Sequence, residues 1–230
     1  MTKGIFITAT GTDIGKTYIS ALIVKKMRDG GYNCGYYKPV LSGAEIKNGK
    51  IYAGDCEYVK SRANLSGNAE DFASYIFKPA VSPHLAAIME NNPIKLEKIK
   101  NDFNNIKSKY DYILVEGAGG IVCPFDLSGD KPILTEDIIK ALGLSVIIVS
   151  KSSLGSINSA VTTVEYAINH SININGLILN QYDKTDFMQA DNKKQIKKLT
   201  DLSVVAAVKQ GDTDLDIDIK ILENLFKEIQ

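Results

Sequence analysis

The amino-acid sequence predicts a single α/β domain in which a doubly wound, mostly parallel β-sheet is flanked by helices. Two observations point to this class. Strand-like apolar runs alternate with helix-like stretches along all 230 residues, as in a sheet with crossover helices. Several of these runs, such as 146–149, are continuous and rich in Ile, Val and Leu. This is typical of strands buried on both faces of a parallel sheet.

The individual elements follow from these runs and from local end signals. We expect strands at residues 4–8, 33–37, 111–115, 144–149, 174–180 and 203–207. We expect helices at residues 16–29, 55–63, 83–91, 95–108, 135–142, 157–169, 189–200 and 217–228. Gly30 and Gly31 end the first helix, and Ser82 before Pro83 indicates the start of another. Because no linker or repeat interrupts the pattern, we expect residues 1–230 to form one domain.

The segment 42–55 carries glycine and charged residues, and we interpret it as a loop. It follows the second strand, so it lies at the edge where the C-terminal ends of the parallel strands meet. Ligands of open α/β sheets bind at that edge.

The composition argues against several classes of partner. Lysine plus arginine and aspartate plus glutamate both number 27, so no basic field recruits nucleic acid. The N-terminus has no signal-peptide pattern, and the longest apolar runs are too short to span a bilayer. Cys34, Cys56 and Cys123 are widely spaced and odd in number, which argues for reduced thiols. We therefore expect a cytoplasmic protein that binds neither nucleic acid nor membrane.

Residues 8–17, Thr-Ala-Thr-Gly-Thr-Asp-Ile-Gly-Lys-Thr, lie between the first strand and the first helix. A glycine-bearing loop ending in Gly-Lys-Thr at this place is the pattern of a phosphate-binding loop. Gly15 permits close approach of the backbone, Lys16 reaches the terminal phosphates, and the Thr17 hydroxyl binds Mg²⁺. Thr10 stands where the strict pattern has glycine. The alternative is an ordinary strand–turn–helix junction with a surface lysine.

Two further charged residues follow neighbouring strands. Lys38 comes just after the second strand, so it emerges beside Lys16, where it can neutralise a transferring phosphoryl group or an anionic substrate. Glu116 closes the third strand, and in phosphate-loop proteins such an acid serves Mg²⁺. Thr17, Asp55 and Glu116 together form a predicted magnesium site. The alternatives are a surface lysine for Lys38 and a capping or loop acid for Glu116.

Five motifs occur in order along the chain. They are the phosphate loop 8–17, Lys38-Pro39-Val40-Leu41-Ser42-Gly43, Ser82-Pro83-His84, Val115-Glu116-Gly117-Ala118-Gly119-Gly120 and Leu154-Gly155-Ser156-Ile157-Asn158. In this order and at this spacing they resemble the dethiobiotin synthetase family, whose fold is of the phosphate-loop NTPase type. The resemblance covers about residues 1–180.

The resemblance implies an ATP- and Mg²⁺-dependent ring closure on 7,8-diaminononanoate. One amine carries CO₂ as a carbamate, and ATP phosphorylates the carbamate oxygen. The second amine then attacks the activated carbonyl, which yields dethiobiotin, the penultimate biotin intermediate, with ADP and phosphate. The resemblance also implies a homodimer in which one loop reaches the substrate across the interface.

The matched motifs imply roles for individual residues. The catalytic residues implied are Lys16, Lys38, Thr12 and Ser42. The nucleotide-binding residues implied are Asp13, Ile14, Gly15, Lys16, Thr17, Tyr18, Glu116, Gly117, Gly119 and Asn180, the last of which reads adenine. The substrate-binding residues implied are Thr12, Lys38, Ser42, Gly155, Ser156, Ile157 and Asn158. The last four of these bind the distal carboxylate at a helix N-terminus. For His84, a packing or capping role stands beside a part in recognition.

A partition-type phosphate-loop ATPase, acting as a dimeric switch, is the main alternative. Such proteins usually carry an extra lysine early in the loop, but no lysine lies between Ala9 and Gly15. The chain also departs from the family at residues 208–211, Val-Lys-Gln-Gly, where family members often have Pro-Trp-Leu. We therefore expect weaker discrimination among nucleotide bases.

Overall fold

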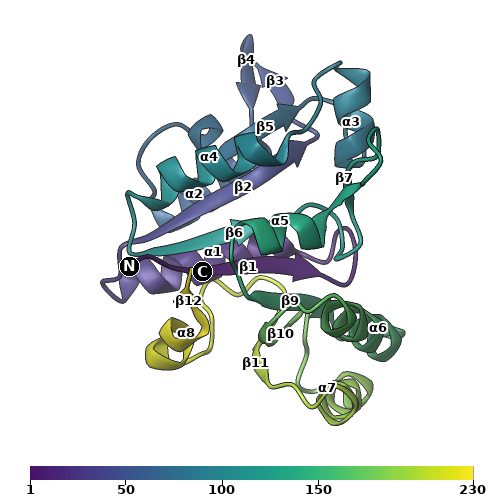
Figure 1. Cartoon of the computed structure of the whole chain (residues 1–230). Helices are drawn as coiled ribbons and strands as arrows, with labels where there is room; N and C mark the ends of the chain where they lie inside the picture. Colours follow the sequence, from purple (N-terminus) through teal and green to yellow (C-terminus); the bar gives the residue numbers. More distant parts are fainter. Residues whose placement is uncertain (230) are drawn as a thin grey trace.

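An eight-stranded sheet runs through residues 1–229, the part of the chain that the computed structural model describes (Figure 1). The strands lie in the order β11-β10-β9-β1-β6-β2-β5, and β12 pairs with β1. They are β1 (Lys3–Ala9), β2 (Cys34–Ser42), β5 (Ala73–Phe77), β6 (Tyr112–Glu116), β9 (Val146–Lys151), β10 (Ile174–Asn180), β11 (Val204–Val208) and β12 (Lys227–Glu228). All pairs along this order are parallel, and β12 is antiparallel to β1. The predicted mostly parallel sheet is confirmed.

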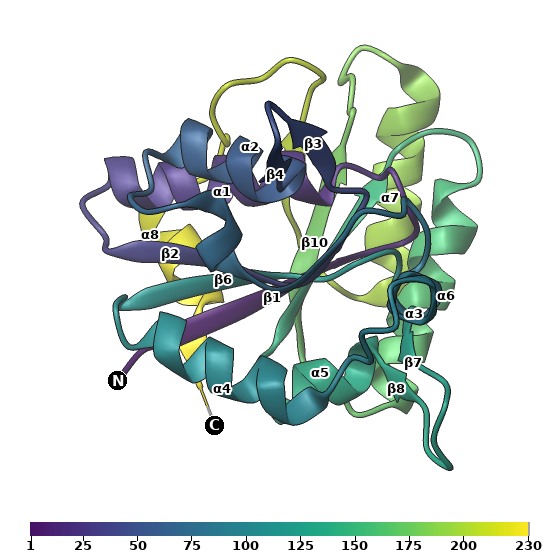
Figure 2. The ribbon, with the colours of Figure 1, turned by 90° about the horizontal axis from the view of Figure 1, so that it is seen from above.

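Helices cover both faces of this sheet, so the doubly wound arrangement is also confirmed. They are α1 (Lys16–Asp29), α2 (Gly54–Ala63), α3 (Pro83–Met89), α4 (Leu96–Lys107), α5 (Thr135–Ala141), α6 (Ser156–Asn169), α7 (Phe187–Thr200), α8 (Ile219–Leu225) and the short 3-10 helix η1 (Ala69–Phe72). Figure 2 shows α1 and α2 on one side of the strands and α4 and α5 on the other.

The sequence of β1 explains why both layers form. Ile5 and Ile7 belong to the apolar core shared with α1 and α2, whereas Phe6 belongs to the core shared with α4 and α5. Side chains of a strand alternate between the faces of its sheet. A strand covered on both sides is therefore apolar at consecutive positions, which is why residues 5–7 of β1 and 146–149 of β9 are continuous apolar runs.

The predicted strands and helices are all present, but the helix predicted at 217–228 ends at Leu225, because residues 227–228 pair with β1 as β12. The largest shift of an end concerns β2. Its predicted end was residue 37, but the strand continues to Ser42. β2 pairs with β6 over Cys34–Tyr37 and with β5 from Lys38 to Ser42. Pro39, which has no N–H to donate, has no registered partner in either strand. Lys38 therefore lies inside the strand and not after it.

The prediction that residues 42–55 form a loop was wrong. They contain a hairpin of β3 (Glu45–Lys47) and β4 (Lys50–Tyr52). Asn48 and Gly49 connect these strands with φ angles of 52° and 76°. Positive φ at both central residues is the requirement of a type I′ hairpin turn, and Asn-Gly is its strongest sequence signal.

The other short strands were also not predicted. β5 and β12 add to the large sheet, and β7 (Pro124–Asp126) pairs with β8 (Ile133–Leu134) in a separate hairpin. Residues 1–229 contain no helix that is both long enough and apolar enough to cross a membrane.

Candidate active site at the ends of the central strands

The loop between β1 and α1 has the conformation that phosphate binding requires. Gly15 adopts φ of 98°, in the left-handed region that favours glycine. The helix begins at the next residue, Lys16, and the Ile19 N–H donates to the Gly15 carbonyl at 3.0 Å. The N–H groups of the first helical turn thus face the loop, as in other helix N-termini that bind anions.

The Lys16 side chain is buried and crosses to a second loop. Its Nζ donates to the Gly119 carbonyl at 2.5 Å and lies 3.4 Å from the Gly11 carbonyl. Burial lowers the pKa of the Lys16 ammonium, and Glu116 opposes that shift. The ammonium is held by backbone oxygens and lacks full hydration, so an incoming phosphate oxygen gains a partner at little desolvation cost.

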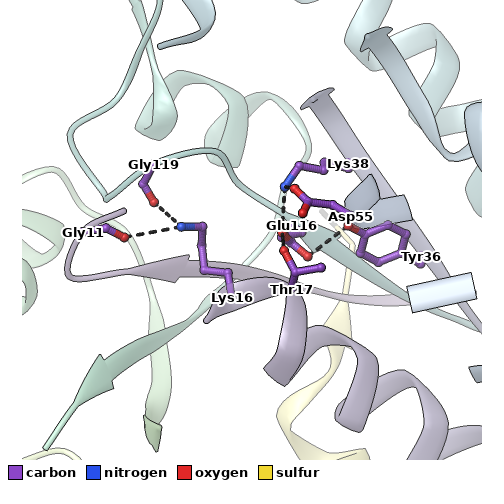
Figure 3. Close-up of polar contacts among 8 residues, drawn as sticks. All are labelled: Gly11, Lys16, Thr17, Tyr36, Lys38, Asp55, Glu116 and Gly119. Atoms are coloured by element: carbon purple, nitrogen blue, oxygen red, sulfur yellow. Dashed lines mark hydrogen bonds and ion pairs between the residues drawn. The ribbon is translucent and has the colours of Figure 1, made fainter. Parts of the chain in front are cut away.

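Lys38 and Glu116 form the centre of the site (Figure 3). Lys38 Nζ lies 2.7 Å from Glu116 Oε1 and 2.8 Å from Asp55 Oδ2. Thr17 Oγ1 donates to Glu116 Oε1 at 2.7 Å, and the Tyr36 hydroxyl donates to Glu116 Oε2 at 2.9 Å. The sheet register explains why Lys38 and Glu116 lie close together. Val115, which precedes Glu116, pairs with Tyr37, which precedes Lys38 in β2, and Glu116 pairs with Ile7 of β1.

The charges of this cluster compensate one another. The Lys38 and Glu116 side chains are 5% and 0% exposed, whereas Asp55 is 41% exposed. Burial alone would lower the pKa of the Lys38 ammonium, but Glu116 and Asp55 outweigh it and raise this pKa above its ordinary value. Burial would likewise raise the pKa of Asp55, but Lys38 outweighs it and lowers this pKa. Burial and the neighbouring Glu116 raise the pKa of the Tyr36 hydroxyl. Lys38 and Asp55 are therefore both charged at neutral pH.

The predicted magnesium ligands fit a hard cation in their chemistry. Thr17, Asp55 and Glu116 offer only oxygen atoms, and the two carboxylates converge on one positive charge, the Lys38 ammonium. Within residues 1–229 no group of three or more His, Cys, Asp or Glu side chains could hold a metal ion alone. A cation here needs further ligands from water or from a bound phosphate, which is the usual situation of Mg²⁺.

A cavity of about 700 Å³ opens beside these groups. Predicted site residues that line it are Thr12, Asp13, Gly15, Lys16, Thr17, Lys38, Ser42, Asp55, Glu116 and Gly119. Lining residues without a predicted binding role are Val40, Ala80, Val81, Ser82, Pro83, Ala118, Gly120, Val122, Cys123 and Pro124. The cavity is therefore charged on the side of the phosphate loop and largely apolar on the side of α3 and β7.

Sequence reasoning missed this apolar wall because its parts are far apart in the chain. Val81 and Pro83 come from the start of α3, and Val122 and Pro124 come from the approach to β7. The Ser-Pro-His motif was the only signal for the first part. His84 itself pairs its Nδ1 with Ser82 Oγ at 3.1 Å and does not line the cavity. Burial raises the pKa of the Cys123 thiol in this wall to about 11, so it remains protonated.

Four predicted nucleotide-binding residues do not line the cavity. A Cβ on Gly117 would lie 2.8 Å from the buried Phe6 ring, so any larger residue there requires a shift of the core. The Tyr18 hydroxyl donates to the Asp212 carbonyl and ties α1 to the loop after β11. Asn180 Nδ2 donates to the Ile14 carbonyl at 2.8 Å, so this side chain contacts the phosphate loop directly.

The predicted carboxylate-binding residues, Gly155–Asn158, also lie outside the cavity. They form the start of α6, where Gly155 has φ of 87° and Ser156 is the first helical residue. Ser156 Oγ is buried without a hydrogen-bond partner among the described residues, and the same holds for Ser42 Oγ at the cavity. A buried hydroxyl without a hydrogen-bond partner is unfavourable, which makes both positions suited to a polar ligand atom.

The strand, phosphate loop and helix, with an acid closing the next strand, define a phosphate-loop nucleoside triphosphatase fold. Residues 3–213 match a family model described as an AAA domain. The chain is 52% identical over 226 residues to an ATP-dependent dethiobiotin synthetase of Clostridium botulinum strain Eklund 17B, covering 98% of this chain and 99% of that protein. It is 47% identical over 229 residues to the enzyme of strain Okra, with full coverage of both. The chain belongs to the ATP-dependent dethiobiotin synthetase family, which confirms the resemblance found in the motifs.

Solved structures show the same fold at low sequence identity. A ParA family ATPase from Chlorobium tepidum has a TM-score of 0.56 at 16% identity, covering 91% of this chain and 84% of that chain. The septum site-determining protein MinD of Pyrococcus horikoshii, solved with Mg-ADP, has a TM-score of 0.57 at 15% identity, covering 98% and 96%. At this sequence identity the structural similarity supports the fold alone. The function is inferred from the relatives with higher sequence identity.

Proposed function

We propose that the protein converts 7,8-diaminononanoate, CO₂ and ATP to dethiobiotin, ADP and phosphate. Membership of the family carries the general function, that of an ATP-dependent ligase of biotin biosynthesis. The observation that carries the chemistry is the pair of buried lysines, Lys16 and Lys38, on one charged cavity wall. Two anionic groups, a carbamate and a terminal phosphate, must meet in this reaction, and two fixed ammonium groups offset their repulsion.

The carbamate binds next to Lys38 and Ser42 in this proposal. Ser42 Oγ is buried without a partner among the described residues, so a carbamate oxygen would satisfy it. Lys38 Nζ gives the same oxygen a positive neighbour. Thr12, exposed in the phosphate loop, lies on the same cavity and is our candidate for the nitrogen end of the substrate.

The phosphoryl group of ATP is held by the phosphate loop. Backbone N–H groups at the start of α1 bind the phosphates, and the Lys16 ammonium exchanges its carbonyl partners for terminal phosphate oxygens. The protein performs no covalent step itself. Lys16 and Lys38 orient the two anions and stabilise the charge that spreads over the transferring group.

Thr17, Asp55 and Glu116 would hold Mg²⁺ in this proposed site, because their oxygens suit it. When bound, it would supply positive charge to the phosphates during transfer. The fold supports this use of the site, since the MinD protein of similar fold was solved with Mg-ADP. Lys38 would then leave its two carboxylates and turn to the carbamate.

The ring closes after phosphorylation. The second amine attacks the activated carbonyl carbon, the new C–N bond forms, and phosphate leaves. The apolar wall, with Val81, Val122 and Pro124, packs against the hydrocarbon chain of the substrate. Exclusion of water from this wall protects the activated carbamate against hydrolysis.

We further propose a homodimer in which one protomer's Gly155–Asn158 binds the distal carboxylate of the substrate in its partner's cavity. These residues do not line the cavity of their own chain, and a helix start with a buried, unpaired Ser156 hydroxyl suits an anion. Leu154 beside them is 86% exposed, and Ile88 and Met89 of α3 are also exposed. Sedimentation analysis tests this arrangement: a concentration-independent monomer would overturn it.

The proposed reaction is tested with ¹³C-bicarbonate, ATP, Mg²⁺ and 7,8-diaminononanoate. Mass spectrometry should find dethiobiotin that carries one ¹³C atom and has lost one oxygen relative to the carbamate. A ¹³C-labelled carbamate that forms but never cyclises would contradict the proposal. The cytoplasmic location stays a prediction from the sequence.

A further inference from the structure

We infer that Asn180 is a positioning residue for the phosphate loop, a role separate from contact with the nucleotide base. This inference deepens the proposed nucleotide site and rests on it. The starting observation is the hydrogen bond of 2.8 Å from Asn180 Nδ2 to the carbonyl of Ile14. The two residues are 166 positions apart in the chain, so only the fold brings them together.

The path of this contact through the sheet is unusual. Asn180 is the last residue of β10, and β9 lies between β10 and β1, the strand from which the loop emerges. The Asn180 side chain therefore extends past the end of β9 to the loop that follows β1. Its other end is fixed as well, because Oδ1 accepts from the N–H of Gln181 at 2.9 Å. The nitrogen and the oxygen of the buried Asn180 amide thus both form hydrogen bonds with backbone groups, which fix the orientation of the amide.

The contact is made to the peptide that leads into Gly15, a residue in the left-handed region of backbone conformation. Ile14 precedes Gly15, whose φ is 98°. A Cβ on Gly15 would lie 2.1 Å from Asn180 Nδ2, so the amide fills the space that the missing side chain leaves. Asn180 thereby fixes the position of the Ile14–Gly15 peptide through its hydrogen bond to the Ile14 carbonyl. The orientation of that peptide decides where the following N–H groups of α1 point, and these are the groups that bind phosphate.

The two roles of Asn180 differ in the ligands that they affect. A residue that reads only adenine changes the binding of ATP and leaves unchanged the binding of a phosphate chain without a base. A residue that positions the loop changes both. Inorganic tripolyphosphate with Mg²⁺ is therefore the discriminating probe, compared with the β,γ-imido analogue of ATP.

The experiment uses isothermal titration of the full-length protein and its Asn180→Ala variant. Loss of one hydrogen bond predicts about threefold to tenfold weaker binding of tripolyphosphate, and at least as large a loss for the ATP analogue. Asn175→Ala is the matched control. Asn175 is on the same strand, and its Nδ2 donates at 2.6 Å to the Leu225 carbonyl, away from the loop. This variant should lower folding stability and leave tripolyphosphate binding unchanged.

The inference would be overturned if Asn180→Ala bound tripolyphosphate with unchanged affinity but bound the ATP analogue more weakly. Asn180 would then be a residue that only recognises the base. Equal weakening in both variants would also overturn it, as a general effect of stability. Amide hydrogen exchange of residues 10–17 in the ligand-free protein gives a second readout that does not depend on any ligand. Exchange there should rise several-fold in Asn180→Ala only, and an unchanged rate counts against the inference even if the proposed reaction is established.

Discussion

Lys38 Nζ lies 2.7 Å from Glu116 Oε1, and both side chains are almost completely buried. The ammonium thus occupies the point on which two of the proposed magnesium ligands, Asp55 and Glu116, converge. This pairing gives the buried Glu116 carboxylate a positive partner. In our proposal the same lysine is also the residue that contacts the carbamate.

Replacement of Lys38 by Met should affect both activity and stability. Turnover should fall by about 10²- to 10³-fold, as expected when a charge that stabilises the transition state is lost. The free energy of unfolding should fall by about 3–5 kcal/mol, because Glu116 is left as an uncompensated buried charge. Phosphate release and urea unfolding measure the two effects.

Lys26→Met is the control for this variant, since Lys26 pairs with the exposed Asp214 and should contribute less than about 1 kcal/mol. The double variant Lys38→Met with Glu116→Gln should regain stability relative to Lys38→Met alone, because the buried charge is gone. Near-normal turnover in Lys38→Met would show that our role for this lysine is wrong.

The pH dependence of stability follows from the pKa shifts of the same cluster. The lowered pKa of Asp55 gives stability that is present above about pH 4, the unfolded value, and is lost as pH falls through the folded pKa. The raised pKa of Lys38 gives stability that is present below about pH 10 and is lost as pH rises through the folded pKa. The stability difference between wild type and the double variant Lys38→Met with Glu116→Gln, which leaves no unpaired charge at position 116, should therefore be constant from about pH 5 to 9. A difference that changes steadily across this window would contradict the assignment.

Replacement of Glu116 by Gln tests the metal site. The amide keeps the volume of the side chain but loses the charge that Mg²⁺ prefers. The Mg²⁺ concentration for half-maximal phosphate release should rise by roughly tenfold or more, which corresponds to about 1.4 kcal/mol. Glu57→Gln on α2, outside the cavity, is the control. An unchanged Mg²⁺ titration in Glu116→Gln would remove this residue from the metal ligands.

Replacement of Lys16 by Ala tests the phosphate loop. Its buried ammonium has carbonyl partners and no carboxylate partner within the described residues, so its removal should affect catalysis more than folding. Turnover should fall by about 10²-fold or more. Lys25→Ala, on the same helix but paired with Asp29 at the surface, should behave as wild type. If Lys25→Ala and Lys16→Ala lose equal activity, the effect belongs to the helix and not to the loop.

Replacement of Asn158 by Ala tests the start of α6 as a carboxylate site. The Michaelis constant for the diamine should rise by roughly threefold to tenfold, with little change in kcat, because the contact is the same in the ground state and the transition state. Asn169→Ala at the other end of the same helix is the matched control. A large fall in kcat without a change in the Michaelis constant would contradict a purely recognitional role.

The residues that the sequence predicted best are those next to strand ends. Lys16, Thr17 and Glu116 follow or close β1 and β6, and parallel strands bring such positions to one edge whatever the rest of the fold does. The hairpin at 45–52 was predictable from Asn48-Gly49, but its turn was read as part of a loop. β5 is a short edge strand, so its periodic signal was weak.

Contacts between distant segments could not be predicted from local patterns. Asn180 was singled out through its family motif, yet its bond to Ile14 depends on the position of β9 between two other strands. The apolar wall from Val81 and Val122 depends on how α3 packs against β7. The pairing of Lys38 with Glu116 required the strand register, because the residue types alone also fit a surface lysine and a loop acid.

The most direct test of the central claim is the release of phosphate from ATP and Mg²⁺, measured with and without 7,8-diaminononanoate and bicarbonate. The account predicts that release requires both co-substrates and equals the amount of dethiobiotin formed. Release that proceeds at the same rate without the diamine would contradict it, and would favour an ATPase of the partition type on this fold.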